Sequence, residues 1–106
     1  MYQKIEEAHI SDESGTPTGG KTTGVGISIN WQNGELGRGA ERKEPNGAFV
    51  EGVIQCALGR LEYYQASAFK CRENALAITK LEEALHWCQH RTAKREQREV
   101  EGTHKV

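Results

Sequence analysis

A cluster of basic residues near the C-terminal end of the chain has the composition of an anion-binding site. Arg91 and Arg95 are four residues apart, so on a helix they share one face, and Lys94 and Arg98 continue the cluster. The planar guanidinium of arginine bonds a phosphate through two parallel N–H groups. A solvated helix end, balanced by the glutamates that follow, is the alternative that the residues leave open.

Three aromatic residues and one amide suggest a second kind of contact. Tyr63, Tyr64 and Phe69 gather where two predicted helices meet, and an exposed ring can stack on a nucleobase for ~1–3 kcal/mol per base. Ordinary packing in a core is the alternative for each ring. Asn74 falls on an apolar seam, where an unpaired amide is costly. It therefore either pairs across an oligomer, which fixes register, or binds a ligand.

An arginine between two glycines forms a third, weaker pattern. Arg38 stands between Gly37 and Gly39, and glycines let a backbone approach a ligand closely. The pattern is neither the dinucleotide-binding G-x-G-x-x-G nor a P-loop. A plain turn is the favoured interpretation from the residues alone.

Patterns typical of catalysis or metal binding are missing from the sequence. His86 and His90 are four residues apart and offer two metal ligands, but no third ligand follows at a usual spacing. The sequence contains no Ser-His-Asp or Cys-His arrangement and no carboxylate pair in an apolar context. We therefore expect no metal, no cofactor and no catalytic residue, which favours a binding protein over an enzyme.

Composition limits the fold and the partners. A chain of 106 residues fits one domain, and 36% hydrophobic residues is low for a small domain that must build its own core. We expect partner subunits to supply buried surface, in a symmetric homo-oligomer. The 14 basic and 15 acidic residues balance, which argues against a nucleic-acid polymer as partner.

Cysteines and hydropathy indicate the compartment. The three cysteines are odd in number and form no C-x-x-C pair, so free thiols in a reducing cytosol are expected. No apolar run approaches the ~18 residues of a membrane span. The first ten residues are polar and do not resemble a signal peptide.

The first part of the chain, residues 1–47, holds most of the glycines and both prolines and predicts a small antiparallel β region. Tyr2 to Ile10 is predicted as an edge strand. Ser11 to Thr23 is rich in turn-forming residues and is predicted as a loop. Val25 to Trp31 alternates apolar and small or polar residues, which predicts a half-buried strand. Asn46 is a candidate cap for the helix that follows.

The second part, residues 48–106, predicts a long antiparallel two-helix hairpin, so the fold class is α+β, in one compact domain overall. Residues 65–70 form the predicted bend, and Gly102 marks the latest end of the second helix. Apolar residues at three- and four-residue steps define the two faces. The first face comprises Val50, Val53, Ile54, Ala57, Leu61 and Tyr64, and the second Cys71, Asn74, Ile78, Leu81, Leu85, Cys88 and Thr92.

Two blocks of this hairpin resemble a known family. They are RLEYYQASAFKCREN at residues 60–74, and LEEALHW followed by RTAKREQREVEGT between residues 81 and 103. They are similar to the helical hairpin of the phage anti-Thoeris sponge family, which shares that hairpin with the anti-CBASS sponge family. The ending R-T-x-x-R-x-x-R-x-V-E-G-T is the most specific part of the match, and the likeness continues more loosely through the glycine–arginine loop.

The resemblance implies a function. Members of the family are oligomers, often hexamers, that sequester glyco-cyclic ADP-ribose (gcADPR), the signal of the Thoeris defence, and release it intact on denaturation. Some relatives also hold cyclic di- or trinucleotides of CBASS at separate sites. The expectation is a phage protein of immune evasion, acting as a nucleotide sponge in the cytoplasm of an infected bacterial host. The alternatives are an enzyme that cleaves the same signal and a helical protein–protein adaptor without a small-molecule site.

The resemblance also implies ligand-binding residues. The aromatic position falls at Tyr64, where the family also has phenylalanine, the asparagine at Asn74, and the two arginines at Arg91 and Arg95. The glycine–arginine loop aligns less cleanly and adds Arg38 and Arg42, one of which is expected to make a further contact.

Helix geometry constrains this set. Asn74 and Arg91 are 17 residues apart, which corresponds to about 25 Å along one helix and about 100° around it. One cyclic nucleotide does not span that distance. If both residues touch one ligand, they are expected to come from different protomers.

Overall fold

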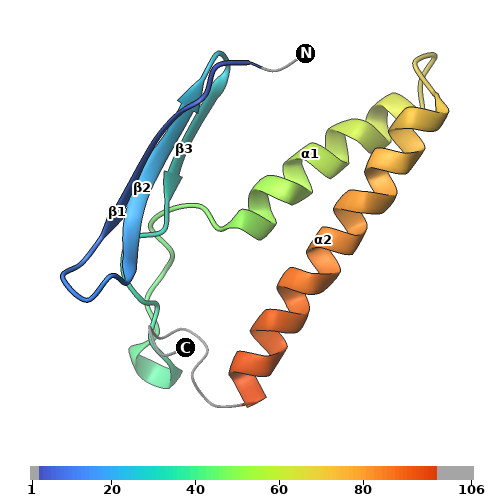
Figure 1. Cartoon of the computed structure of the whole chain (residues 1–106). Helices are drawn as coiled ribbons and strands as arrows, with labels where there is room; N and C mark the ends of the chain where they lie inside the picture. The colour runs from blue at the N-terminus through green and yellow to red at the C-terminus, as the bar shows by residue number, and fades with distance from the viewer. Residues whose placement is uncertain (1–2, 98–106) are drawn as a thin grey trace. The chain divides into compact units, whose positions relative to one another are not determined.

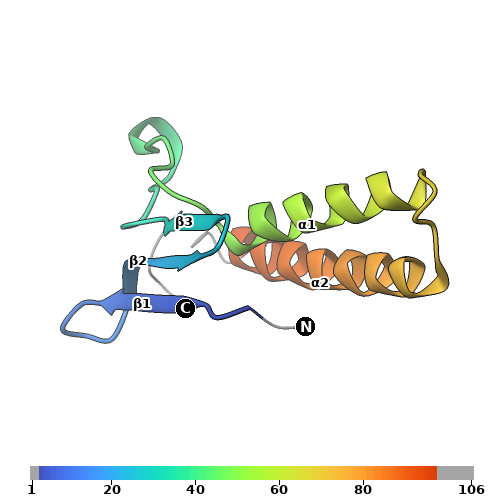
Figure 2. The ribbon, with the colours of Figure 1, turned by 90° about the horizontal axis from the view of Figure 1, so that it is seen from above.

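The computed structural model describes residues 3–97, in which residues 3–49 and residues 50–97 form separate units. The first unit is a three-stranded antiparallel sheet and the second a two-helix hairpin, which confirms the predicted α+β class (Figures 1 and 2). Arg98 and Gly102, predicted to lie near the end of the second helix, are outside the described residues. The elements are β1 (Glu6–Ser11), β2 (Pro17–Gly24), β3 (Ile27–Trp31), the 3₁₀ turn η1 (Gly39–Glu41), α1 (Val50–Gln65) and α2 (Arg72–Gln97).

The sheet has the order β1-β2-β3, so β1 is an edge strand, as predicted, but it begins at Glu6 and ends at Ser11, one residue beyond the predicted end. The carboxylate of Asp12 shapes the β1–β2 turn by accepting the backbone N–H groups of Ser14 at 2.9 Å and Thr16 at 3.1 Å. β3 is also shorter than predicted, because Val25 lies in the turn before it and is 85% exposed.

The prediction of a loop from Ser11 to Thr23 holds for residues 12–16, which form the β1–β2 turn, but it is wrong from Pro17 onward, because β2 lies there as the central strand, paired on both sides. The segment lacks the apolar alternation that marks a strand and is rich in glycine, so its local pattern indicates a loop. The glycines of this segment let β2 lie close to its neighbouring strand. A Cβ on Gly20 would collide with the carbonyl oxygen of Ala8, and the φ of Gly20, +141°, disfavours other residues.

Few side chains of the sheet unit are buried. Among residues 3–49 only Leu36 and Thr22 are buried. The indole Nε1 of Trp31 donates to the Thr22 hydroxyl at 2.8 Å, which satisfies both polar groups across neighbouring strands.

Asn46 does not cap a helix, because α1 begins four residues later, at Val50. Its side chain instead pairs with the backbone of Asn33, accepting the N–H at 2.9 Å and donating to the carbonyl at 3.0 Å. The backbone N–H of Asn46 donates to the side-chain oxygen of Gln32 at 2.9 Å. These bonds join the segment after β3 to the segment before α1, and a sequence pattern does not show such pairing.

The helices α1 and α2 lie side by side in both views and run antiparallel (Figures 1 and 2). The seam from Asn74 to Thr92 is confirmed, since its members are half-buried along α2. Cys71 is an error in that seam, because it is exposed and precedes α2. In α1 the predicted face is half-buried at Val53, Ile54, Leu61 and Tyr64. Val50 and Ala57 are exposed, and Leu58 is half-buried in place of Ala57. Neighbouring positions satisfy a seven-residue spacing almost equally, so the pattern alone did not choose between them.

The hairpin has no buried interior of its own. Within the described residues, no side chain of α1 or α2 is fully buried, and the faces in contact are half-buried at most. All three cysteines are free, as predicted. Neither described helix combines the length and the apolarity that crossing a bilayer requires.

The first prediction tests the close approach at Gly20. Gly20→Ala is expected to lower the free energy of unfolding more than Gly26→Ala, as measured by thermal or denaturant unfolding. Both glycines have positive φ, but only at Gly20 would a Cβ meet backbone, whereas at Gly26 it meets nothing within 4 Å. Equal losses for the two variants would show that the tight pairing of β1 and β2 does not matter for stability.

Candidate functional site

A network of short hydrogen bonds shapes the bend between α1 and α2. The side-chain amide of Gln65 donates to the carbonyl of Cys71 at 2.9 Å and accepts its N–H at 3.1 Å. Ser67 donates its hydroxyl to the Tyr64 carbonyl at 2.6 Å and accepts the N–H of Phe69 at 3.1 Å. These bonds satisfy backbone groups that the ends of the two helices leave open. The bend is therefore a defined platform for the residues next to it.

Asn74 is held at this bend by its own amide. Its Nδ2 donates to the carbonyl of Phe69 at 3.2 Å, and the side chain is half-buried. The sequence predicted that Asn74 either pairs across an oligomer or binds a ligand. The bond to Phe69 within the same chain is a third role, which the sequence did not predict. The side-chain oxygen has no partner among the described residues and can accept a hydrogen bond from a ligand.

The aromatic residues at the bend do not fill a core within the chain. Tyr63 is 62% exposed and Phe69 is 75% exposed, while Tyr64 is half-buried between them. The ring of Tyr64 packs against both neighbours. Its centroid is 6.2 Å from that of Tyr63 and 6.5 Å from that of Phe69, and the second pair meets edge to face. The bend thus presents ring surface that a planar ligand can cover.

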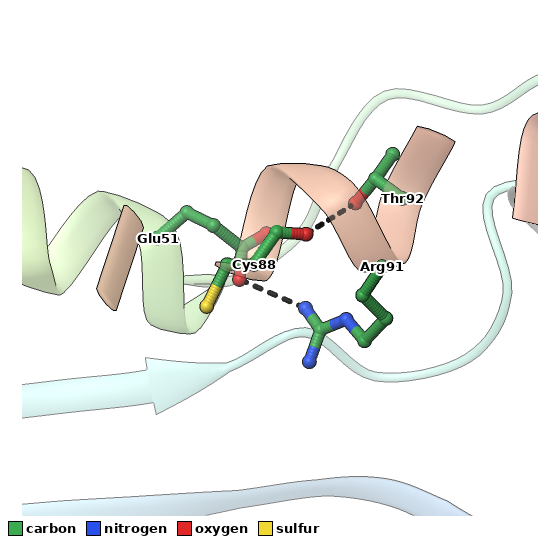
Figure 3. Close-up of polar contacts among 4 residues, drawn as sticks. All are labelled: Glu51, Cys88, Arg91 and Thr92. Carbon is green, nitrogen blue, oxygen red and sulfur yellow. Dashed lines mark hydrogen bonds and ion pairs between the residues drawn. The ribbon is translucent and has the colours of Figure 1, made fainter. Parts of the chain in front are cut away.

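The other end of the hairpin carries the predicted arginines. Nη2 of Arg91 donates to Oε1 of Glu51 at 3.0 Å, joining the last part of α2 to the first turn of α1 (Figure 3). Thr92 donates its hydroxyl back to the carbonyl of Cys88 at 3.3 Å (Figure 3). Arg95, in the last turn of α2, is half-buried on the same face as Thr92. The side chain of Arg91 is 60% exposed, and one guanidinium has further N–H groups to offer to an anion.

The structure therefore sorts the predicted hairpin residues into two groups. Tyr64 and Asn74 lie at the bend, and Arg91 and Arg95 lie at the open end. The helix α2 is continuous from Arg72 to Gln97, so the rise of about 1.5 Å per residue separates Asn74 from Arg91 by about 25 Å. One chain does not bring the four residues together.

Arg38 and Arg42 belong to the sheet unit and flank the 3₁₀ turn η1. The backbone N–H of Arg42 donates to Gly39 at 3.2 Å, and Gly37 and Gly39 both have positive φ, at +83° and +62°. Both arginines are exposed. The local structure is a tight turn, with two cations at its ends.

Two other features lie apart from these residues. His86 and His90 pack edge to face on Trp87, with centroid distances of 5.6 and 5.8 Å, and residues 3–97 hold no group of three side chains that suits a metal. An open hollow of about 410 Å³ lies on the sheet unit, and Lys21 and Asn33 are among its lining residues. It contains none of the predicted site residues, and a wide opening offers a ligand little enclosure. We therefore place the candidate site on the hairpin.

Two contact residues escaped the sequence analysis. Glu51 is 40 positions from Arg91, and no local pattern links them. Arg60 places its guanidinium over the rings of Tyr63 and Tyr64. Its spacing of three and four residues from those tyrosines is a signal that could have found it.

Comparison with known proteins gives two matches. Residues 26–93 match the family model of the Acb2/Tad1 hairpin domain. That range includes Tyr64, Asn74 and Arg91 but ends two residues before Arg95. A protein of Bacillus phage SBSphiJ7, Thoeris anti-defense 1, is 63% identical over 59 residues. This alignment covers 56% of the chain and 42% of the relative, so the chain spans less than half of the relative's length.

The second prediction concerns the bend. Gln65→Ala is expected to cost about 1–2 kcal/mol in free energy of unfolding, because two hydrogen bonds to Cys71 are lost. Gln55→Ala, at an exposed position of the same helix, is the matched control and is expected to change stability by less than about 0.5 kcal/mol. Denaturant unfolding measures both. Equal values would mean that the Gln65 bonds do not hold the bend.

Proposed function

This chain belongs to the Acb2/Tad1 hairpin family, and from that premise we propose that it is a phage anti-defence protein that binds and sequesters a cyclic nucleotide immune signal without degrading it. The proposed signal is gcADPR of the Thoeris defence, with cyclic di- or trinucleotides of CBASS as further ligands. The relative's name, Thoeris anti-defense 1, supports this assignment. The proposed place of action is the cytoplasm of the infected host.

The observation that carries the proposal is the separation of two complementary half-sites on one hairpin. The bend offers an aromatic ring and an amide, which suit a nucleobase and a ribose. The open end offers two arginines, which suit a diphosphate. Together they match the chemical parts of a cyclic nucleotide with a diphosphate.

We propose that the complete pocket forms between protomers. A second hairpin in antiparallel orientation places its open end beside the first one's bend, which brings Arg91 and Arg95 of one copy to Tyr64 and Asn74 of the other. The lack of buried side chains in the hairpin supports such an assembly, because its exposed apolar faces need a cover. The proposed assembly is a homo-oligomer, with the family's hexamer as the expected form.

In this pocket Tyr64 stacks on the adenine, and Asn74 bonds a base edge or a ribose hydroxyl. Arg91 and Arg95 neutralise the diphosphate, and Arg38 or Arg42 adds a further contact. At nanomolar affinity the binding free energy is about −12 kcal/mol, which one stack and several charged hydrogen bonds reach when the pocket is preformed. Each of these steps is binding, and none requires a general base or a metal.

The third prediction is tight binding with recovery of intact ligand. Isothermal titration with gcADPR and a panel of cyclic di- and trinucleotides is expected to give at least one nanomolar ligand. Tyr64→Ala and Arg91→Ala are each expected to weaken it by at least about tenfold, through the loss of a stack or a charged hydrogen bond. Lys80→Ala, an exposed cation elsewhere on α2, is the control and is expected to leave affinity unchanged.

Chromatography of the ligand released by heating then separates three functions. Intact ligand is the expected result for a sponge. Altered ligand would make the protein an enzyme, with His86 and His90 as the first residues to test. The absence of binding to every panel member would contradict the proposal and favour an adaptor, for which the exposed Trp87 on the outer face of α2 is a candidate contact.

The fourth prediction tests whether two protomers share one pocket. Tyr64→Ala and Arg91→Ala proteins are each expected to lack sites of wild-type affinity, but a mixture refolded together is expected to regain about a quarter of those sites. An intact site needs the bend of an Arg91→Ala chain and the open end of a Tyr64→Ala chain. In an equal mixture that assembles at random, this combination occurs at about one site in four. Titration of the refolded mixture measures the number of sites. A mixture with no more sites than the separate variants would show that each chain carries its own pocket.

A further inference from the structure

Arg60 lies over the aromatic pair at the bend. Its guanidinium carbon is 5.1 Å from the ring centroid of Tyr63 and 4.9 Å from that of Tyr64, within the ~6 Å range of a cation–π contact. Arg60 precedes the two tyrosines by three and four residues, so the three side chains share one face of α1. The bend therefore carries a cation directly beside its stacking ring.

The hydrogen-bonding capacity of Arg60 is unused within residues 3–97. Its side chain makes no hydrogen bond or ion pair with any described residue, and the residue is exposed. Arg91 differs in this respect, because Glu51 already accepts one of its N–H groups. A guanidinium has five N–H donors in a planar fork, and those of Arg60 are open to a ligand.

We propose that Arg60 is a further ligand-contact residue, which bonds a phosphate of the nucleotide whose base stacks on Tyr64. This inference rests on the proposed function and deepens it. A nucleotide carries its first phosphate one sugar away from its base, so a cation beside the stacking ring is within reach of that phosphate. The bend half-site then has a phosphate-binding side chain of its own and is not a purely aromatic surface.

With Arg60, both halves of the proposed pocket carry positive charge. Arg91 and Arg95 approach the diphosphate from the open end of one protomer, and Arg60 approaches it from the bend of the other. A diphosphate carries more than one negative charge, so cations on both sides raise the affinity of the complete pocket above that of either half. A ligand without phosphate gains nothing from Arg60, which makes the residue a determinant of specificity.

A purely structural role for Arg60 has a different signature. If the guanidinium only fixes the orientation of Tyr64, its removal weakens stacking, and the loss does not depend on salt. If it bonds a phosphate, the lost interaction is electrostatic and is screened by salt. The ionic-strength dependence of the dissociation constant therefore distinguishes the two roles.

The experiment is titration of the wild-type chain, Arg60→Gln, Arg60→Lys and Lys80→Gln with gcADPR and the cyclic nucleotide panel, at about 0.05 M and about 0.5 M salt. Arg60→Gln is expected to raise the dissociation constant of the bound ligand at least about tenfold at low salt. It is also expected to lose less affinity than wild type as salt rises. Arg60→Lys, which keeps the charge, is expected to recover part of the loss, and Lys80→Gln to match wild type.

The outcomes separate this inference from the proposed function. Wild-type binding with unchanged affinity in Arg60→Gln would overturn the role of Arg60 and leave the sponge standing. A loss of affinity with the wild-type salt dependence would also overturn it, because Arg60 would then only position Tyr64. No binding by the wild type to any probe would remove the proposed function, and this inference with it. Thermal melting of Arg60→Gln close to that of wild type confirms that the variant is folded.

Discussion

Two helices packed against each other can hide only one face of each, and this constraint governs the hairpin. The facing positions of α1 and α2 are half-buried, and the remaining faces are exposed to solvent. A chain of this kind gains little free energy from its own burial. Exposed apolar side chains such as Trp87 and Phe69 are consistent with surfaces that a partner or a ligand covers. Assembly and binding thus draw on the same uncovered surface.

The length of α2 imposes the second constraint. A continuous helix of 26 residues keeps the side chains at its two ends far apart, whatever their chemistry. Asn74 is fixed to the bend through Phe69, and Arg91 is fixed to α1 through Glu51. The hairpin therefore keeps the rings of the bend apart from Arg91 and Arg95 at the open end. In the proposed pocket, the second protomer removes that separation, and the ligand binds only where the two ends meet.

Both ends of the hairpin hold side chains in place before a ligand binds. At the bend, hydrogen bonds through Gln65 and Ser67 set the backbone, and Arg60 lies over the rings without a hydrogen-bonding partner among residues 3–97. At the open end, Glu51 already holds Arg91. Both arrangements reduce the side-chain freedom that binding would otherwise remove, and such preorganisation favours tight capture of a small ligand.

Local patterns in the sequence were enough for the α+β class, the two helices, the edge strand and the seam of α2 from Asn74 to Thr92. These features depend on the periodicity of side chains along one segment, and a periodicity is visible in the sequence itself. The types of the candidate binding residues are visible in the same way. The family resemblance added their roles, which remain a proposal.

The tertiary structure alone decided which segments pair. It made a glycine-rich stretch the central strand β2, moved Asn46 from a helix cap to a bridge with Asn33, and chose Leu58 over Ala57 for the seam. It also joined Arg91 to Glu51 across 40 residues. The physical reason is the same in each case. Contacts between distant segments depend on three-dimensional pairing, and neighbouring residues along the chain carry little information about it.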